Sequence, residues 1–70
     1  MTDEFTKLAI EKQNEIASTE QLTLQEYLSF REWFFKQRKN VGRRMAARNF
    51  DLFFAIHGMD IKMIKDDNQI

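Results

Sequence analysis

Few residues in this sequence could perform chemistry, and none stands in a recognisable catalytic motif. The chain has no cysteine, so a cysteine nucleophile and thiolate metal ligands are excluded. A serine nucleophile would need Ser18 or Ser29 to meet the single histidine, His57, and no nucleophile-elbow sequence surrounds either serine. One histidine cannot anchor a histidine-rich metal site, and we interpret His57 as a cap or dipole partner near a helix end.

Two pairs of acids are the remaining candidates for acid–base chemistry: Glu11 with Glu15, and Asp66 with Asp67. Acids on a helix surface or in a tail are usually solvated. The sequence also lacks a glycine-rich phosphate loop and an HExxH motif. A chain of 70 residues is too short to enclose a typical substrate pocket. We therefore expect a protein that is not an enzyme and that uses no cofactor, metal ion or small-molecule substrate.

Charge is balanced in total but uneven along the chain. The 11 basic and 11 acidic residues give a formal net charge of zero, which argues against a simple polycation for nucleic acid. Residues 1–32 nevertheless carry seven acids and three bases, whereas residues 33–50 carry six bases and no acid. The six bases are Lys36, Arg38, Lys39, Arg43, Arg44 and Arg48.

This basic segment supports two interpretations. Two helices joined by a glycine-containing turn have the layout of a helix-turn-helix. In that layout Arg43, Arg44 and Arg48 would read bases, and Lys36 and Lys39 would reach phosphates. The first helix is long for that motif, however, and the second is mostly apolar. The alternative is a solvated basic rim that pairs with the acidic first half, within the chain or across a dimer, or that binds an acidic protein partner.

Hydrophobic spacing predicts an all-α fold with helices over about 3–17, 24–39 and 43–57. Proline is absent and glycine occurs only twice, so few residues interrupt helices. A chain of this length allows one domain, which we place over residues 1–70.

The ends of these helices carry local signals. Thr23 and Glu26 match a capping box at the start of the second helix. Gly42 is expected to close that helix in a left-handed conformation, and Gly58 to stop the third. For residues 59–70 we favour a short helical turn or an irregular arm. Apolar and polar residues alternate at the start of this tail, which also suits a short edge strand.

The second helix has a broad apolar arc, formed by Leu24, Tyr27, Leu28, Phe30, Phe34 and Phe35. Arg31 and Arg38 fall within it. We expect their aliphatic stems to lie on phenylalanine rings while their heads reach water. A buried ion pair with Asp51 or with a glutamate of the first helix is the alternative.

Trp33 lies on the opposite, polar side of the second helix. Tryptophans are highly buried on average, so the first helix or the tail could cover this side chain as part of the core. Tryptophan is also enriched at interface hot spots, so Trp33 could instead anchor a partner. The sequence leaves both interpretations open.

The third helix has an apolar arc that spans more than half its circumference. It comprises Met45, Ala46, Ala47, Phe50, Leu52, Phe53, Phe54 and Ile56. The preceding helices can cover only part of such a surface. Either the apolar residues of the tail or a second copy of the chain must cover the rest, and this favours a homo-oligomer.

These features predict a helical protein-interaction module that self-associates and acts as a regulator or accessory factor. We expect the partner to contact Trp33, Phe30, Met45, Leu52 and Ile56, an aromatic face with a basic rim. A DNA-binding regulator that uses the basic turn over residues 36–48 is the alternative. No secretory leader and no run of about 18–20 apolar residues is present, so we expect a cytoplasmic protein that does not bind membranes.

Overall fold

Three chain segments place apolar side chains at helical spacing, and each folds as an α-helix. The computed structural model describes residues 4–62, in which α1 spans Glu4–Ile16, α2 spans Leu24–Gln37 and α3 spans Arg43–His57. A short 3₁₀ helix, η1, spans Lys39–Val41 between α2 and α3. The predicted three-helix, all-α domain is confirmed. The bounds of α3 are as predicted, whereas α2 ends two residues before the predicted position 39.

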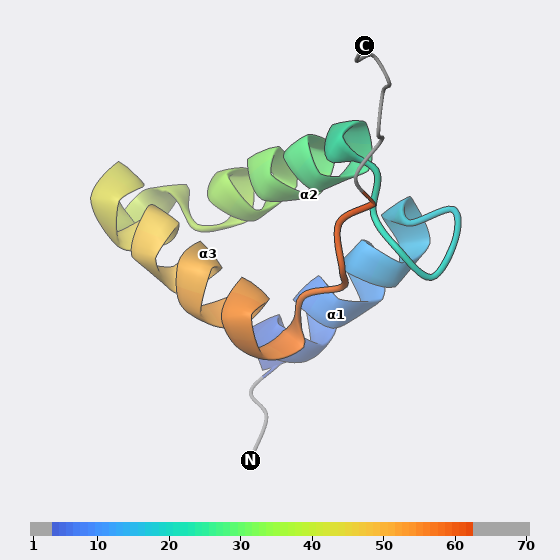
Figure 1. Cartoon of the computed structure of the whole chain (residues 1–70). Helices are drawn as coiled ribbons and strands as arrows, with labels where there is room; N and C mark the ends of the chain where they lie inside the picture. Colours follow the sequence, from blue (N-terminus) through green and yellow to red (C-terminus); the bar gives the residue numbers. More distant parts are fainter. Residues whose placement is uncertain (1–3, 63–70) are drawn as a thin grey trace, which may run out of the picture.

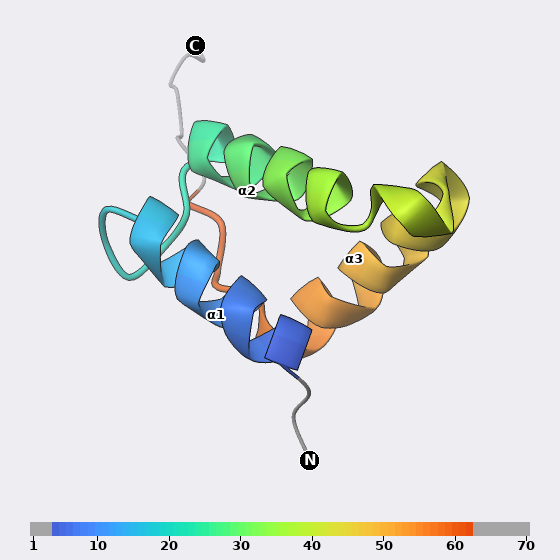
Figure 2. The ribbon, with the colours of Figure 1, turned by 180° about the vertical axis from the view of Figure 1, so that it is seen from behind.

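The three helices lie along the sides of a triangle (Figure 1), and the view from behind shows the same arrangement (Figure 2). Phenylalanine side chains fill its centre. Phe34 of α2 and Phe50 of α3 meet edge to face with ring centroids 5.2 Å apart, and Phe30 lies 5.8 Å from Phe53. All four rings are buried together with Ala9, whose small side chain lets α1 pack closely against them.

The predicted capping box at the start of α2 is confirmed. Thr23 Oγ1 accepts a hydrogen bond from the backbone N of Glu26 at 3.1 Å, and Glu26 Oε1 accepts one from the backbone N of Thr23 at 2.9 Å. The other carboxylate oxygen of Glu26 accepts a hydrogen bond from Ser18 Oγ at 2.7 Å. Glu26 therefore joins the end of the α1–α2 loop to its beginning.

The turn between α2 and α3 differs from the prediction. The backbone N of Arg38 donates to the carbonyl oxygens of Phe34 and Phe35, which ends α2. Gly42 has a positive φ of 90°, as a glycine at a tight corner can, but it follows η1 instead of closing the last turn of α2. The carbonyl oxygen of Gly42 accepts a hydrogen bond from the backbone N of Ala46 at 2.9 Å, so Gly42 is the N-cap residue of α3.

The described part of the tail is extended, so of the predicted alternatives the helical turn is wrong there, whereas an irregular arm agrees with it. Leu22 and Ile61 form a parallel bridge. The backbone N of Leu22 donates to the Asp60 oxygen at 2.8 Å, and the backbone N of Lys62 donates to the Leu22 oxygen at 2.6 Å. These two hydrogen bonds hold the end of the segment beside the α1–α2 corner (Figure 1). The remainder of the predicted turn, over residues 63–70, lies outside the described residues.

Candidate binding surfaces

An exposed apolar stripe runs along one flank of α3. Met45, Leu52 and Ile56 are 50%, 60% and 72% exposed. They follow each other at intervals of seven and four residues, which places them on one side of the helix. Half-buried Asn49 lies between them on the same side. We call these four residues the α3 stripe. The described end of the tail, residues 60–62, pairs with Leu22 and not with this surface.

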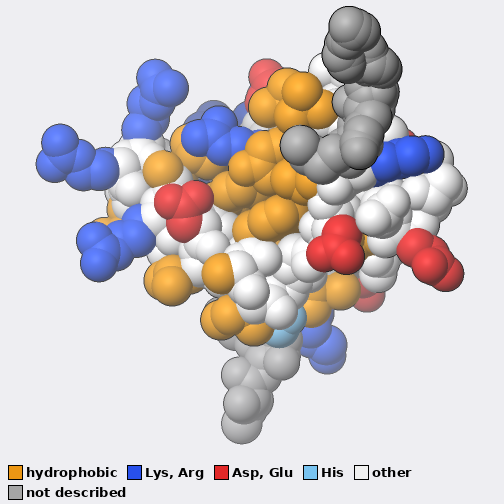
Figure 3. Space-filling model, in the orientation of Figure 1, with side chains coloured by type: hydrophobic (Ala, Val, Ile, Leu, Met, Phe, Trp, Pro, Cys, Tyr) orange, Lys and Arg blue, Asp and Glu red, His pale blue; other side chains and the backbone are white. Residues whose placement is uncertain are grey.

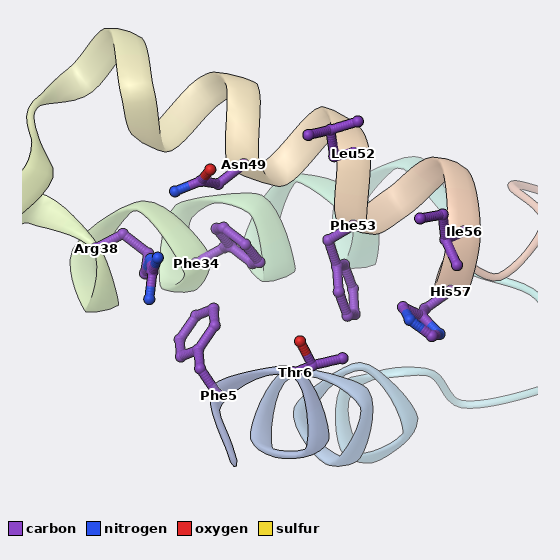
Figure 4. A pocket seen from close by; sticks show the side chains of 9 residues that line it. All are labelled: Phe5, Thr6, Phe34, Arg38, Asn49, Leu52, Phe53, Ile56 and His57. Atoms are coloured by element: carbon purple, nitrogen blue, oxygen red, sulfur yellow. The ribbon is translucent and has the colours of Figure 1, made fainter. Parts of the chain in front are cut away.

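A groove of about 250 Å³ lies beside the α3 stripe, between α3 and the start of α1 (Figure 4). The guanidinium carbon of Arg38 lies 4.6 Å from the ring centroid of Phe5, at one end of the groove. Arg38 Nε is buried and has no hydrogen-bond partner among the described residues. The guanidinium head of Arg38 thus lies on a phenylalanine ring where its aliphatic stem was expected, and its buried Nε differs from the expectation that the head reaches water. The groove is lined by Phe5, Thr6, Phe34, Arg38, Asn49, Leu52, Phe53, Ile56 and His57.

Phe30 and Trp33 take different places from those predicted for a partner-binding face. Phe30 is fully buried among the core rings and offers no surface to a partner, so its predicted role is corrected to the core. Trp33 is half-buried, and its ring stacks nearly parallel on Phe30, 5.9 Å between centroids, and on Phe5, 6.1 Å. Lys12 Nζ lies 6.0 Å from its centroid. Side chains of α1 therefore cover Trp33, which agrees with the first of the two interpretations of this residue, a place in the core.

The turn between α2 and α3 forms a basic corner, which we define as Lys36, Lys39, Arg43, Arg44 and Arg48. All five side chains are exposed, and Figure 3 shows Lys and Arg side chains projecting where α2 and α3 meet. Within residues 4–62, Lys12 Nζ forms an ion pair with Glu15 Oε1 at 3.6 Å. None of the five bases of the basic corner forms an ion pair with a residue of that range. The expected pairing of this rim with the acidic first half is therefore not seen within residues 4–62.

A second hollow, of about 580 Å³, lies between α2 and the start of α3. We call it the α2–α3 groove. Apolar side chains of Leu28, Phe35 and Ala46 line it together with four bases. The guanidinium carbon of Arg31 lies 4.6 Å from the Phe35 centroid, so here too the head lies on a ring where the aliphatic stem was expected. The remaining lining residues are Glu32, Lys36, Lys39, Gly42 and Arg43.

Sequence reasoning missed the α2–α3 groove as a site, because it exists only where two helices diverge from a shared turn. The available signal was the spacing of Leu24, Leu28, Arg31 and Phe35 along α2. This spacing repeats the intervals of four, three and four residues found in the α3 stripe. It puts a mixed apolar and basic row on one flank of α2.

Gln13 joins α1 to the end of α3, and the sequence analysis did not predict this role. Its side chain is 1% exposed. Gln13 Nε2 donates to the carbonyl oxygen of His57 at 3.1 Å, and Gln13 Oε1 accepts from the backbone N of Met59 at 2.7 Å. The signal was its place four residues after Ala9, on the buried line of α1. The imidazole of His57 lies 5.4 Å from the Phe53 ring.

No family model, curated protein or solved structure matches this chain. Within residues 4–62, no three histidine, aspartate or glutamate side chains converge as metal ligands would. No helix of that range is long and apolar enough to cross a membrane. The function is therefore inferred from the surfaces described above.

Proposed function

We propose that this chain is a non-enzymatic protein-interaction module that pairs with a second copy of itself through the α3 stripe. The observation that carries this proposal is the exposure of Met45, Leu52 and Ile56 along one flank of a single helix. Large apolar side chains gathered in this way lose contact with water when a second surface covers them. Isologous pairing is the commonest way in which a small domain covers such a patch.

The spacing of the α3 stripe suits packing of one helix on another. Residues 45, 49, 52 and 56 follow the alternating intervals of four and three that form the seam between paired helices. The amide of Asn49 adds a polar group in the middle of that seam. A polar group at such a position fixes the register and orientation of paired helices.

Charge favours an antiparallel arrangement of the two α3 helices. The first part of α3 is basic, with Arg43, Arg44 and Arg48, and a parallel pair would bring these ends together. An antiparallel pair separates them.

Disulfide trapping tests this arrangement, because the natural chain has no cysteine. In an antiparallel pair, position 45 of one copy lies opposite position 56 of the other. A mixture of the Met45→Cys and Ile56→Cys chains should therefore form mixed disulfide dimers under mild oxidation, while Met45→Cys alone should not. Leu24→Cys, at an exposed position on α2, provides the control. Efficient linking of Met45→Cys to itself would show a parallel pair, and equal linking by all variants would refute pairing through α3.

Nucleic-acid binding is the second candidate, and it is favoured by the exposed bases of the basic corner, which form no ion pair with any of residues 4–62. Binding of a DNA duplex would weaken steeply with added salt, because each phosphate contact releases counterions. Fluorescence anisotropy at several salt concentrations measures this slope. If Arg44→Ala with Arg48→Ala leaves duplex binding unchanged, this candidate is excluded.

A further inference from the structure

We propose that the α2–α3 groove binds an acidic amphipathic helix of a partner protein. The apolar side chains of the partner enter the groove, and its carboxylates meet the basic rim. This inference does not rest on self-association, because the groove shares no residue with the α3 stripe or with the hollow beside it. Two copies paired through α3 and a single copy would both present the groove.

The groove has an apolar base that the chain itself leaves uncovered. Leu28 is 46% exposed and Phe35 is half-buried, while the buried side chain of Ala46 closes the base from α3. Leu24, 60% exposed, extends this row by one helical turn toward the start of α2. Figure 3 shows hydrophobic side chains gathered across the face between α2 and α3. A partner that brings only charge would leave this row in water.

The rim of the groove is basic. Arg31, Lys36, Lys39 and Arg43 line it against one acid, Glu32. None of the four bases forms an ion pair with a described residue. The head of Arg31 rests on the ring of Phe35, which holds the guanidinium beside the apolar base, within reach of a partner carboxylate.

The combination distinguishes a protein segment from a nucleic acid. A helix with leucines on one side and glutamates beside them supplies an apolar ridge and flanking carboxylates together, as amphipathic helices do in hydrophobic grooves. A duplex supplies phosphates at regular intervals and no apolar ridge. The structure therefore favours the acidic helix.

Fluorescence anisotropy with defined probes tests this proposal on the full chain. The probe is a labelled peptide of about 18 leucine, glutamate and alanine residues, long enough to form a helix, with leucines at intervals of three and four. A scrambled peptide of identical composition and a short DNA duplex serve as competitors. We expect saturable binding of the patterned peptide, binding of the scrambled peptide weaker by about tenfold, and poor competition by the duplex.

Matched variants locate the binding site. Leu28 in the groove and Leu8 on α1 are both 46% exposed, so Leu28→Gln should weaken peptide binding about tenfold while Leu8→Gln leaves it unchanged. Lys39→Glu with Arg43→Glu should abolish binding, whereas Lys7→Glu with Lys62→Glu, which are also exposed but lie outside the groove, should not. Circular dichroism confirms that each variant keeps its helices.

Several outcomes would overturn the proposal. These are equal affinity for the patterned and scrambled peptides, no peptide binding at all, and tighter duplex binding that ignores Leu28→Gln. The last would identify the basic corner as a nucleic-acid surface. Leu52→Gln, which disrupts the α3 stripe, should leave peptide affinity unchanged. This variant separates failure of self-association from failure of the groove.

Discussion

Gln13 Oε1 lies 2.7 Å from the backbone N of Met59, and this hydrogen bond joins the last turn of α1 to the chain just beyond α3. The same amide donates to the carbonyl oxygen of His57, so one buried side chain satisfies two backbone groups at the end of α3. Gln13 thereby closes the triangle of helices at the corner where no covalent turn joins its two sides.

Replacing Gln13 should therefore destabilise the domain. Gln13→Leu leaves the N–H of Met59 and the carbonyl of His57 without their partner, and the loss of each of these partly buried hydrogen bonds should cost about 1 kcal/mol. Urea unfolding measures the loss. Gln25→Leu, at an exposed position of α2, is the control and should change stability little. Equal stability of the two variants would show that the amide of Gln13 contributes nothing to closure.

The capping box should make stability depend on pH in the acid range. Hydrogen bonds from the backbone of Thr23 and then from the side chain of Ser18 hold the pKa of Glu26 below its ordinary value of about 4.5. A carboxyl whose folded pKa is lowered stabilises the fold above its unfolded pKa. That contribution disappears as pH falls through the folded pKa.

The measurement is urea unfolding of wild type and Glu26→Gln between neutral and acid pH. Wild type should be the more stable at pH 7, and the difference should shrink as pH falls below about 4.5. Glu32→Gln, an exposed position on the same helix, controls for general charge effects. A difference that stays constant over the whole range would contradict the role given to Glu26.

Local signals in the sequence were sufficient to predict the three helices and the residues at which they start. The capping box of Thr23 and Glu26 acts over three residues, and the bounds of α3 follow from its periodicity and from Gly42 and Gly58 on either side. The alternation of apolar and polar residues left an extended tail open as an alternative, but the choice between it and a helical turn depends on backbone hydrogen bonds with Leu22, far away in sequence. Helical spacing alone cannot supply such a long-range partner.

The candidate surfaces were predictable only in part. The exposure expected for Met45, Leu52 and Ile56 followed from an apolar arc too wide for the available cover. The position of Trp33 depended on Phe5, which reaches it from α1 through tertiary packing. Periodicity within α2 gave no information about that neighbour.

Gly58 should tolerate no side chain. It ends α3 as predicted, and a Cβ at this position would lie 2.6 Å from Phe54 Cγ, too close for any real contact. Because the ring of Phe54 packs against the core, Gly58→Ala should lower stability by about 1–3 kcal/mol. Thermal unfolding measures this loss. The comparison variant is Ala55→Gly, at an exposed position in the last turns of α3, and this substitution should lower stability by about 1 kcal/mol. A Gly58→Ala chain as stable as wild type would contradict the close approach.

Trp33 should contribute to folding more than to association. Its ring stacks on Phe5 and Phe30, so Trp33→Ala should lower the free energy of unfolding by about 2–3 kcal/mol. Urea unfolding monitored by circular dichroism measures this loss. Sedimentation under conditions where the variant stays folded should show unchanged self-association. Weakened association with full stability would instead identify Trp33 as an interface anchor.

The α3 stripe is tested most directly by two variants at equally exposed leucines. Leu52 in the stripe and Leu24 on α2 are both 60% exposed. Sedimentation velocity over a range of concentrations should show that wild type and Leu24→Gln have the mass of two chains and that Leu52→Gln has the mass of one. Wild-type protein that sediments as a single chain at every concentration would contradict pairing through α3.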